Sequence, residues 1–374
     1  MRIGVPREIK NHEYRVGLVP ASVSELCRQG HQLMVETGAG SGIGASDNDY
    51  RQAGATIAET AAAVFGAAEL IVKVKEPQRS EIALIRPEQI LFTYLHLAAD
   101  PDQAAGLIER GAVAIAYETV TDAQGRLPLL APMSDVAGRM AVQVGAHYLE
   151  KPQGGAGVLL SGVPGVAPGT VVVLGAGVVG AAAVRMAVGM GARVIVLNKG
   201  SERLRDLDHL YPGRLTTVES SATAIEEWVP QADLLVGAVL VVGAHAPKLV
   251  SRATLRRMRP GTVAVDVAID QGGCFETSRP TSHAQPTFVE EGVTHYCVTN
   301  MPGAVARTSA LALNNETLPF VAALAAKGWR RALREDSHLR DGLNICRSAV
   351  THQAVAAALG RPYTPAASLL GSGS

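Results

Sequence analysis

The 374-residue sequence is poor in cysteine, with four scattered residues and no CxxC pair. This spacing argues against a disulfide framework and against the common zinc sites, and it favours a reducing compartment, so we expect a cytoplasmic protein. The histidines form no HExxH-type pair, and we therefore expect no metal site. Neither Ser41 nor Ser161 lies in a GxSxG frame, so a serine hydrolase is not indicated.

An excess of one charge and a long apolar run are also missing. Lysine and arginine together number 34, as do aspartate and glutamate, so no basic surplus favours nucleic acid or an anionic membrane. No apolar run reaches the about 18 residues needed to span a bilayer, and the start, MRIGVPREIK, lacks a signal-peptide layout. We expect no export, no membrane and no nucleic acid, with small molecules and further copies of the chain as partners.

The chain is long enough for two domains of roughly 150 residues each. Short apolar runs alternate with helical segments in its first third, which is typical of βαβ units and a parallel sheet. The predicted strands there are Ile3 to Val5, Gln32 to Glu36, Leu70 to Val74, Ile90 to Tyr94 and Val113 to Tyr117. The predicted helices include Ser22 to Gln29 and Asp102 to Arg110.

A second strand series follows a predicted long helix at 135–150, for which Ser134 is the candidate N-cap. Its strands are Val171 to Leu174, Arg193 to Leu197, Leu234 to Gly237, Val263 to Val267 and His295 to Val298. The stretch 309–359 is expected to be largely helical and to pack on the first domain. We therefore predict a substrate domain of residues 1–128 plus 305–374 and a dinucleotide-binding domain of residues 129–304.

The most informative motif is VVVLGAGVVG, Val171 to Gly180, in which an apolar strand leads into Gly175, Gly177 and Gly180. In a dinucleotide site these glycines allow a tight turn, close approach of the backbone to a pyrophosphate, and close packing of helix on strand. A helical segment follows, so the context that the motif requires is present on both sides. A purely structural glycine turn is the alternative.

Four ionisable residues follow predicted strands, where ligands of open parallel sheets bind. These residues are Arg15, Lys75, His96 and Asp270. Taken singly, each has an ordinary structural role: a surface arginine, a solvated lysine, a hydrogen-bonded and partly buried histidine, and a helix-capping aspartate. Together with a nucleotide turn, they indicate a site that binds a carboxylate, polarises a carbonyl and moves protons.

The chain resembles the bacterial L-alanine dehydrogenases. The resemblance is carried by segments spread along nearly the whole chain: RIGVPREIKNHEYRV, VKVKEP, YLHLA, MSDVAGRMAVQ, VLGAGVVG, LVGAVLVVGAHAPKLV, VDVAIDQGGCFET and TNMPGAVARTSA. Proton-translocating transhydrogenases and saccharopine dehydrogenases share parts of this pattern and fit it less well.

The resemblance implies two Rossmann-like, doubly wound α/β domains with mainly parallel sheets and an active site in the cleft between them. It implies that Arg15 and Lys75 bind the substrate carboxylate and carbonyl and that His96 and Asp270 transfer protons, with Lys75 also counted as catalytic. It places Tyr94, Met133 and Asn300 around the substrate. The cofactor-binding residues that it implies, together with two basic neighbours, are Ser134, Gly175, Gly177, Gly180, Asn198, Lys199, Arg203, Val239 and Met301.

The implied activity is the reversible oxidative deamination of L-alanine to pyruvate and ammonium, with hydride transfer to a nicotinamide cofactor. A homohexamer is implied as well. Two alternatives stay open: a dehydrogenase of another small 2-amino acid, and a transhydrogenase-like nucleotide-binding subunit.

The sequence departs from the family pattern at the end of its second dinucleotide-domain strand. NAD enzymes place an acidic residue there for the ribose hydroxyl, whereas ARVIVL ends in Asn198 and is followed by KGSERLR. Asparagine does not repel a 2′-phosphate, and Lys199, Arg203 and Arg205 are placed to attract one. The family leads us to expect NAD, but these residues predict relaxed or NADP-leaning selectivity, which an NAD preference above roughly 1000-fold (~4 kcal/mol) would rule out.

Overall fold

The computed structural model describes residues 1–239 and 246–371. The chain forms two compact units, Met1–Pro132 with Gly303–Ser374, and Met133–Pro302. The sequence predicts domain changes after residues 128 and 304, and the units change after Pro132 and Pro302. Part of the motif LVGAVLVVGAHAPKLV, residues 240–245, lies outside the described residues.

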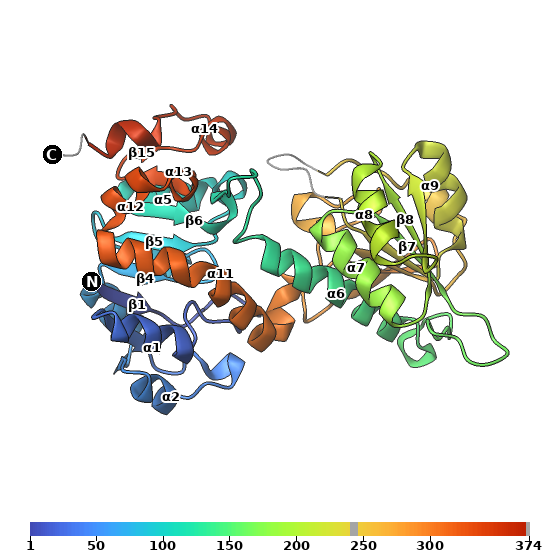
Figure 1. Cartoon of the computed structure of the whole chain (residues 1–374), viewed down its shortest axis with the longest axis horizontal. Helices are drawn as coiled ribbons and strands as arrows, with labels where there is room; N and C mark the ends of the chain where they lie inside the picture. Colours follow the sequence, from blue (N-terminus) through green and yellow to red (C-terminus); the bar gives the residue numbers. More distant parts are fainter. Residues whose placement is uncertain (240–245, 372–374) are drawn as a thin grey trace. The chain divides into compact units, whose positions relative to one another are not determined.

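Met1–Pro132 and Gly303–Ser374 form unit 1, and Met133–Pro302 form unit 2. Unit 1 is built on a sheet with the strand order β15-β14-β6-β5-β4-β1-β2-β3 (Figure 1). All neighbouring strands from β6 to β3 are parallel, whereas β14 is antiparallel to both β6 and β15. The strands are β1 (Arg2–Val5), β2 (Gln32–Glu36), β3 (Thr56–Ala58), β4 (Leu70–Val72), β5 (Ile90–Thr93), β6 (Val113–Ala116), β14 (Leu343–Cys346) and β15 (Ala349–Val350).

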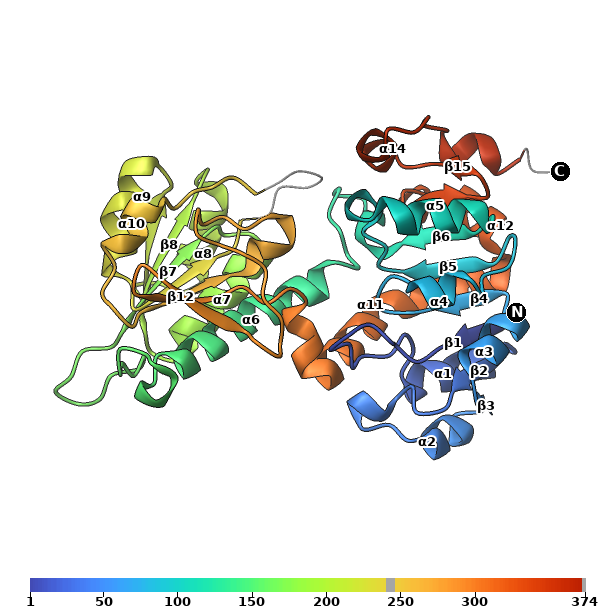
Figure 2. The ribbon, with the colours of Figure 1, turned by 180° about the vertical axis from the view of Figure 1, so that it is seen from behind.

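Helices cover both faces of this sheet. One face carries α3 and α5 (Figure 2). Phe65 of α3 and Leu107 of α5 belong to the same buried cluster as Ile71 and Leu91 of the central strands. The other face carries α1 and α11 (Figure 1). The helices of unit 1 are α1 (Pro20–Arg28), α2 (Asp47–Gln52), α3 (Ala61–Ala67), α4 (Arg79–Ile82), α5 (Pro101–Glu109), α11 (Ala306–Lys327), α12 (Trp329–Glu335), α13 (Ser337–Arg340) and α14 (Gln353–Leu359).

Unit 2 repeats the pattern with the strand order β12-β13-β11-β10-β7-β8-β9, in which only β12 runs antiparallel. Its strands are β7 (Thr170–Leu174), β8 (Arg193–Asn198), β9 (Leu215–Glu219), β10 (Leu234–Gly237), β11 (Val263–Asp266), β12 (Thr287–Glu290) and β13 (Val293–Tyr296). Its helices are α6 (Ala131–Tyr148), α7 (Val178–Gly189), α8 (Glu202–Leu210), α9 (Ala222–Trp228) and α10 (Arg252–Arg256). Strand β7 is buried throughout, as expected for a parallel strand covered on both faces.

Each sheet reverses its winding once. In unit 1 the chain runs outward through β1, β2 and β3 and returns to β4 beside β1, and in unit 2 it returns from β9 to β10 beside β7. The predicted α/β class, with two doubly wound and mainly parallel Rossmann-like sheets, is confirmed. Ligands of such sheets bind at the carboxyl ends of the strands beside the reversal, so these ends are where each unit can carry a site.

Some local predictions are wrong. Helix α6 begins at Ala131, so Ser134 lies inside its first turn and is not the N-cap. The helix can begin before Pro132 because the first N–H groups of a helix have no partner within it, and a proline there loses no hydrogen bond. The stretch 309–359 also contains β14 and β15, which add antiparallel strands at the sheet edge. Strands β3, β9 and β12 were not predicted, since they are short or partly exposed.

No helix among the described residues is both long and apolar enough to cross a membrane.

One side chain ties α11 to the loop that follows β1. The Asn314 side chain accepts a hydrogen bond from Val19 N at 2.8 Å and donates one to Gly17 O at 3.0 Å. It is 2% exposed, so both backbone groups depend on it and not on water. A Cβ added at Gly17 would lie 2.3 Å from the Val72 carbonyl oxygen, which shows how closely this loop passes the end of β4.

We predict that Asn314→Ala lowers the free energy of unfolding of unit 1 by about 2–4 kcal/mol, because a buried N–H and a buried C=O lose their partner. Trp329 lies in unit 1 and Trp228 in unit 2, so urea unfolding followed by Trp329 fluorescence in a Trp228→Phe background reports on unit 1. Asn315→Ala on the exposed side of α11 is the control and should change stability by less than about 0.5 kcal/mol. Equal losses in the two variants would contradict the prediction.

Candidate active site

Unit 1 brings three of the predicted residues to the carboxyl ends of neighbouring strands in its sheet. Arg15 follows β1, Lys75 follows β4 and His96 follows β5, and these strands are parallel neighbours. Tyr94 links them: its phenol and the Arg15 guanidinium interact electrostatically, and its ring stacks on the His96 ring with centroids 5.9 Å apart and an interplanar angle of 7°. Thr93 Oγ1 donates to the Lys75 carbonyl at 3.0 Å. The strand ends therefore place these groups in one neighbourhood.

Arg15 is fully buried and held by a carboxylate that sequence reasoning missed. Its Nε and Nη2 donate to Glu13 Oε1 and Oε2 at 2.7 and 2.5 Å, and its backbone N donates to Oε1 at 3.0 Å. Burial opposes the charged guanidinium, but the hydrogen bonds and charge of Glu13 outweigh it and raise the pKa of Arg15. The guanidinium plane is thus fixed by Glu13.

A second buried cation lies beside this pair. The Lys73 ammonium, 0% exposed, donates to Glu8 at 3.1 Å and to Glu81 at 2.7 Å. Burial raises the pKa of Glu8 to about 6, although Lys73 and the Val74 N–H act in the opposite direction. Burial would lower the pKa of Lys73, but the two carboxylates reverse this and raise it. Lys73 is therefore a buried structural cation, and the predicted Lys75 is the half-buried lysine of the pair.

Lys75 and His96 both influence the carboxyl of Glu76. Burial raises the pKa of this carboxyl, yet Lys75, a hydrogen bond and charge from Lys10, and the charge of His96 together lower it. Lys75 and His96 therefore act on the same carboxylate, which lies directly after Lys75 in the chain.

The backbone at His96 is unusual. His96 has φ 51° and ψ 37°, the left-handed conformation that costs a non-glycine residue of order 1 kcal/mol. Glu118, in the short helix η3 (Tyr117–Thr119) after β6, accepts from the N–H of His96 at 2.6 Å and from that of Leu95 at 3.2 Å. Extending the strand-end survey to the strand at 113–117 would have found Glu118, because it follows that strand directly.

The structure also decides between the ordinary roles considered for these residues. Arg15 is 2% exposed and is not a surface arginine. His96 is exposed, so it is not a partly buried histidine. Asp270 is exposed within η6 (Val267–Gln271), and the residue that caps this helix is Asp266, whose carboxylate accepts from Ala268 N at 3.1 Å. Asp270 therefore caps no helix.

In unit 2 the glycine motif forms the predicted tight turn after β7. Gly175 has φ +100°, which only glycine adopts readily, and a Cβ at Gly180 would lie 1.8 Å from the Gly175 carbonyl oxygen. A Cβ at Gly177 would instead meet only the Arg203 guanidinium, at 3.2 Å. Gly175 also packs near Val239 at the end of β10, beside the winding reversal. The turn thus presents bare backbone at the α7 N-terminus next to a guanidinium, which fits a pyrophosphate.

Asn198 at the end of β8 is bound to this turn. Its Oδ1 accepts from Ala176 N at 2.9 Å, and its Nδ2 donates to the carbonyls of Lys199 and Gly200 at 3.0 and 3.1 Å. An aspartate could keep the first contact but would turn its second oxygen toward the two carbonyls. A carboxylate lies nearby, since Glu219 accepts from Gly200 N at 2.9 Å.

The remaining predicted residues lie at other places in unit 2. Asp270 is in the loop after β11, which Asp266 organises by accepting from Cys274 N at 2.8 Å and from Ser278 Oγ at 2.5 Å. Asn300, with φ 64°, and Met301, 3% exposed, follow β13. The other two, Met133 and Ser134, lie in the first turn of α6.

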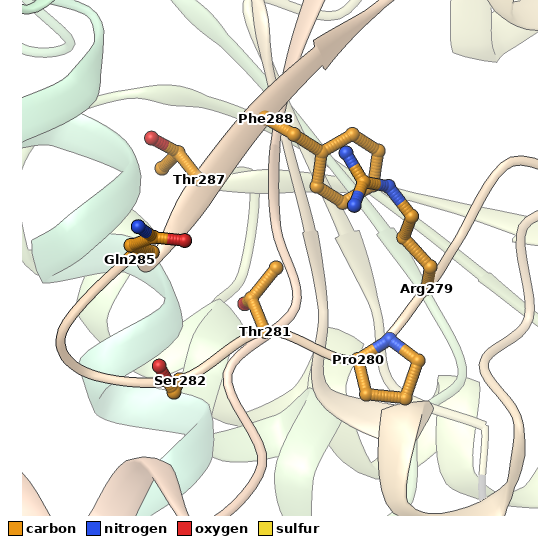
Figure 3. Close-up of a pocket in the computed structure, with 7 residues that line it drawn as sticks. All are labelled: Arg279, Pro280, Thr281, Ser282, Gln285, Thr287 and Phe288. Carbon is orange, nitrogen blue, oxygen red and sulfur yellow. The ribbon is translucent and has the colours of Figure 1, made fainter.

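Unit 2 also carries a polar hollow of about 420 Å³ beside β12 (Figure 3). The Arg279 guanidinium covers the Phe288 ring at 4.1 Å on one side of it, and Thr281, Ser282 and Gln285 form the other side. None of the predicted site residues lines this hollow. Among the described residues, no group of three or more His, Cys, Asp or Glu side chains could hold a metal ion.

Comparison with known proteins places the chain in a family. The model "Alanine dehydrogenase/PNT, N-terminal domain" matches residues 4–137, and "Alanine dehydrogenase/PNT, C-terminal domain" matches residues 141–353. The chain is 60% identical over 371 residues to an alanine dehydrogenase of Halomonas elongata, covering 99% of this chain and 100% of that protein.

Solved structures agree with these matches. An L-alanine dehydrogenase has a TM-score of 0.94 at 52% identity and covers 96% of this chain and 99% of its own. A transhydrogenase from Sinorhizobium meliloti has a TM-score of 0.82 at 24% identity, covering 94% and 100%, and shares the fold. From both domain models and the full-length identity, the chain belongs to the alanine dehydrogenase/PNT family.

Proposed function

We propose that this protein catalyses the reversible oxidative deamination of L-alanine: alanine, oxidised nicotinamide cofactor and water give pyruvate, ammonium, reduced cofactor and a proton. The observation that carries the proposal is the grouping of a buried guanidinium, an ammonium and an imidazole at three neighbouring strand ends of unit 1. The full-length identity to alanine dehydrogenases supports it.

The substrate would bind to unit 1 through its carboxylate and carbonyl. Arg15 presents a planar fork whose orientation Glu13 fixes, and a carboxylate bound there leaves its α-carbon in a defined position. The Lys75 ammonium stabilises negative charge that develops on the carbonyl or carbinolamine oxygen. Tyr94, Met133 and Asn300 would limit the side chain to a small group.

Proton transfer would fall to His96 and Asp270. Imidazole exchanges protons near neutral pH, and the His96 side chain is exposed at the strand end and able to reach a reacting amine or water. The exposed Asp270 would accept or relay the same proton. In this scheme the nicotinamide supplies only the acceptor for the hydride that leaves the α-carbon.

The cofactor would bind to unit 2. Gly175, Gly177 and Gly180 would receive the pyrophosphate at the α7 N-terminus, with Arg203 beside it. Asn198 would lie at the ribose, and Val239, Ser134 and Met301 would contact the rest.

The deciding experiment is oxidation of NADH and NADPH by pyruvate, which we expect to depend strictly on ammonium. His96→Ala and Asp270→Ala should each lower turnover by about 100-fold or more, while cofactor affinity measured by NADH fluorescence stays unchanged. Near-normal turnover in both variants would contradict the proposed proton transfer by His96 and Asp270.

The same assay separates the alternatives. Rates with pyruvate, 2-oxobutyrate and glyoxylate show whether alanine or another small 2-amino acid is the better substrate. A transhydrogenase-like subunit would bind nucleotide but would not reduce NAD or NADP with alanine as the only reductant.

We expect Arg15→Lys to raise KM for pyruvate by about 10- to 100-fold with a smaller effect on kcat, because a single ammonium cannot replace two parallel charge-assisted bonds. KM for the cofactor should not change. Arg86→Lys is the matched control, since the Arg86 guanidinium binds the Phe65 and Ala68 carbonyls elsewhere in unit 1. A pyruvate KM that is equal in the wild type and Arg15→Lys would contradict carboxylate binding by Arg15.

For the cofactor we propose that both NAD and NADP are accepted. Asn198 contributes no charge, while Lys199 and Arg203 place positive charge near the turn and Glu219 places one negative charge there. Lys199 and Arg203 favour a 2′-phosphate, whereas Glu219 opposes it, so discrimination should be weak.

Lys199→Ala should lower kcat/KM for NADPH by about tenfold or more and change that for NADH by less than about twofold, since a charged hydrogen bond to phosphate is lost. Arg193→Ala removes the same charge from the opposite end of β8 and should affect neither. If NADH were preferred more than roughly 1000-fold (~4 kcal/mol) by the wild type, the proposal of dual use would fail.

Two further properties follow from the family resemblance and stay predictions. A homohexamer would be recognised by light scattering of the purified chain. A cytoplasmic location would be tested by fractionation, and the four cysteines, all free thiols, agree with a reducing compartment.

A further inference from the structure

Glu118 connects two neighbouring strand ends of unit 1. It lies in η3 after β6, and its carboxylate reaches the segment that follows β5, the strand paired with β6. Oε1 accepts from His96 N at 2.6 Å and from Leu95 N at 3.2 Å, and Oε2 accepts from Leu95 N at 3.2 Å. Both oxygens therefore bind the backbone of this segment.

These hydrogen bonds account for the left-handed backbone of His96. Successive N–H groups in a turn containing a left-handed residue can point to one side and form a concavity that binds an anion. Here the anion is a carboxylate of the protein. Without it, His96 would lose the partner of a short N–H bond and the compensation for its φ of 51°.

The backbone conformation determines where the imidazole lies. The His96 ring stacks on Tyr94, and the Tyr94 hydroxyl donates to the Leu129 carbonyl at 2.5 Å. If the His96 backbone moved to an ordinary conformation, its Cα–Cβ bond would point in a different direction and the stacked arrangement would be lost.

We propose that Glu118 is a positioning residue that holds His96 through its backbone N–H and acts on the reaction only through His96. The inference rests on the proposed function, in which His96 transfers a proton. Glu118 is not assigned a proton-transfer step, because its oxygens bind backbone amides.

The test is a double-mutant cycle on kcat for pyruvate reduction at saturating NADH and ammonium. Glu118→Ala should lower kcat by about 100-fold, the scale expected for a misplaced catalytic group, and leave KM for NADH unchanged. In a His96→Ala background, Glu118→Ala should change kcat by less than about twofold, because no imidazole is left to position.

Glu118→Gln separates hydrogen bonding from charge. The glutamine carbonyl can take the place of Oε1 and accept from both N–H groups, so this variant should stay within about tenfold of the wild-type kcat. It also keeps the proposal testable if Glu118→Ala does not fold. A Gln variant as inactive as the Ala variant would overturn the positioning role, since the charge rather than the acceptor would then be what matters.

Glu69→Ala is the matched control. Glu69 precedes β4 and accepts from Arg2 N of the neighbouring strand β1 at 2.9 Å. It therefore makes the same kind of contact at the amino ends of the strands, whereas Glu118 lies at their carboxyl ends. Its loss should leave kcat within about twofold of wild type.

Three results would have distinct meanings. Normal kcat in Glu118→Ala together with an inactive His96→Ala would overturn this inference alone. A further loss of more than about fivefold from Glu118→Ala in the His96→Ala background would also overturn it, by showing an effect independent of His96. Normal kcat in His96→Ala would instead remove the proposed role of His96 and, with it, this inference.

Discussion

The site of unit 1 depends on keeping two cations buried at the point where the sheet reverses its winding. A buried guanidinium or ammonium is costly unless carboxylates pair with it and complete its hydrogen bonds. Glu13 does this for Arg15, and Glu8 and Glu81 do it for Lys73. Because Glu8, Glu13 and Arg15 all lie in the loop after β1, the ion pairs also determine the path of that loop, which Asn314 then fixes at its far end.

Carboxylates hold the loops of both units that carry the proposed proton-transfer residues. Glu118 binds the N–H groups at His96, and in unit 2 the buried Asp266 binds those of Cys274 and Phe275 in the loop that carries Asp270. Burial raises the pKa of Asp266, and the hydrogen bonds of Ser278, Phe275 and Cys274 counteract this only in part. In each unit the carboxylate that shapes the loop, Glu118 or Asp266, is a different residue from the proposed proton-transfer residue, His96 or Asp270.

Much of the fold could be predicted from the sequence because parallel strands buried on both faces appear as continuous apolar runs, as in TVVVL of β7. The strands at the sheet edges were missed because β9 and β12 are partly exposed and β15 is only two residues long. Arg15, Lys75 and His96 could be predicted as candidates because they follow strands. Glu13 and Glu8 could not, because only the folded loop shows which acidic residues face the buried cations.

Asn198 shows why the cofactor preference is harder to derive than the cofactor site. The glycine turn needs a polar acceptor at the end of β8, and the Oδ1 of asparagine meets that need at Ala176 N as well as a carboxylate would. The amide nitrogen then binds Lys199 O and Gly200 O, which fixes the turn that carries the basic residue. An amide instead of a carboxylate at this position thus removes a negative charge from the end of β8 and adds hydrogen bonds within the turn that carries Lys199. The proposed use of both NAD and NADP therefore depends on Lys199, Arg203 and Glu219 together, and not on residue 198 alone.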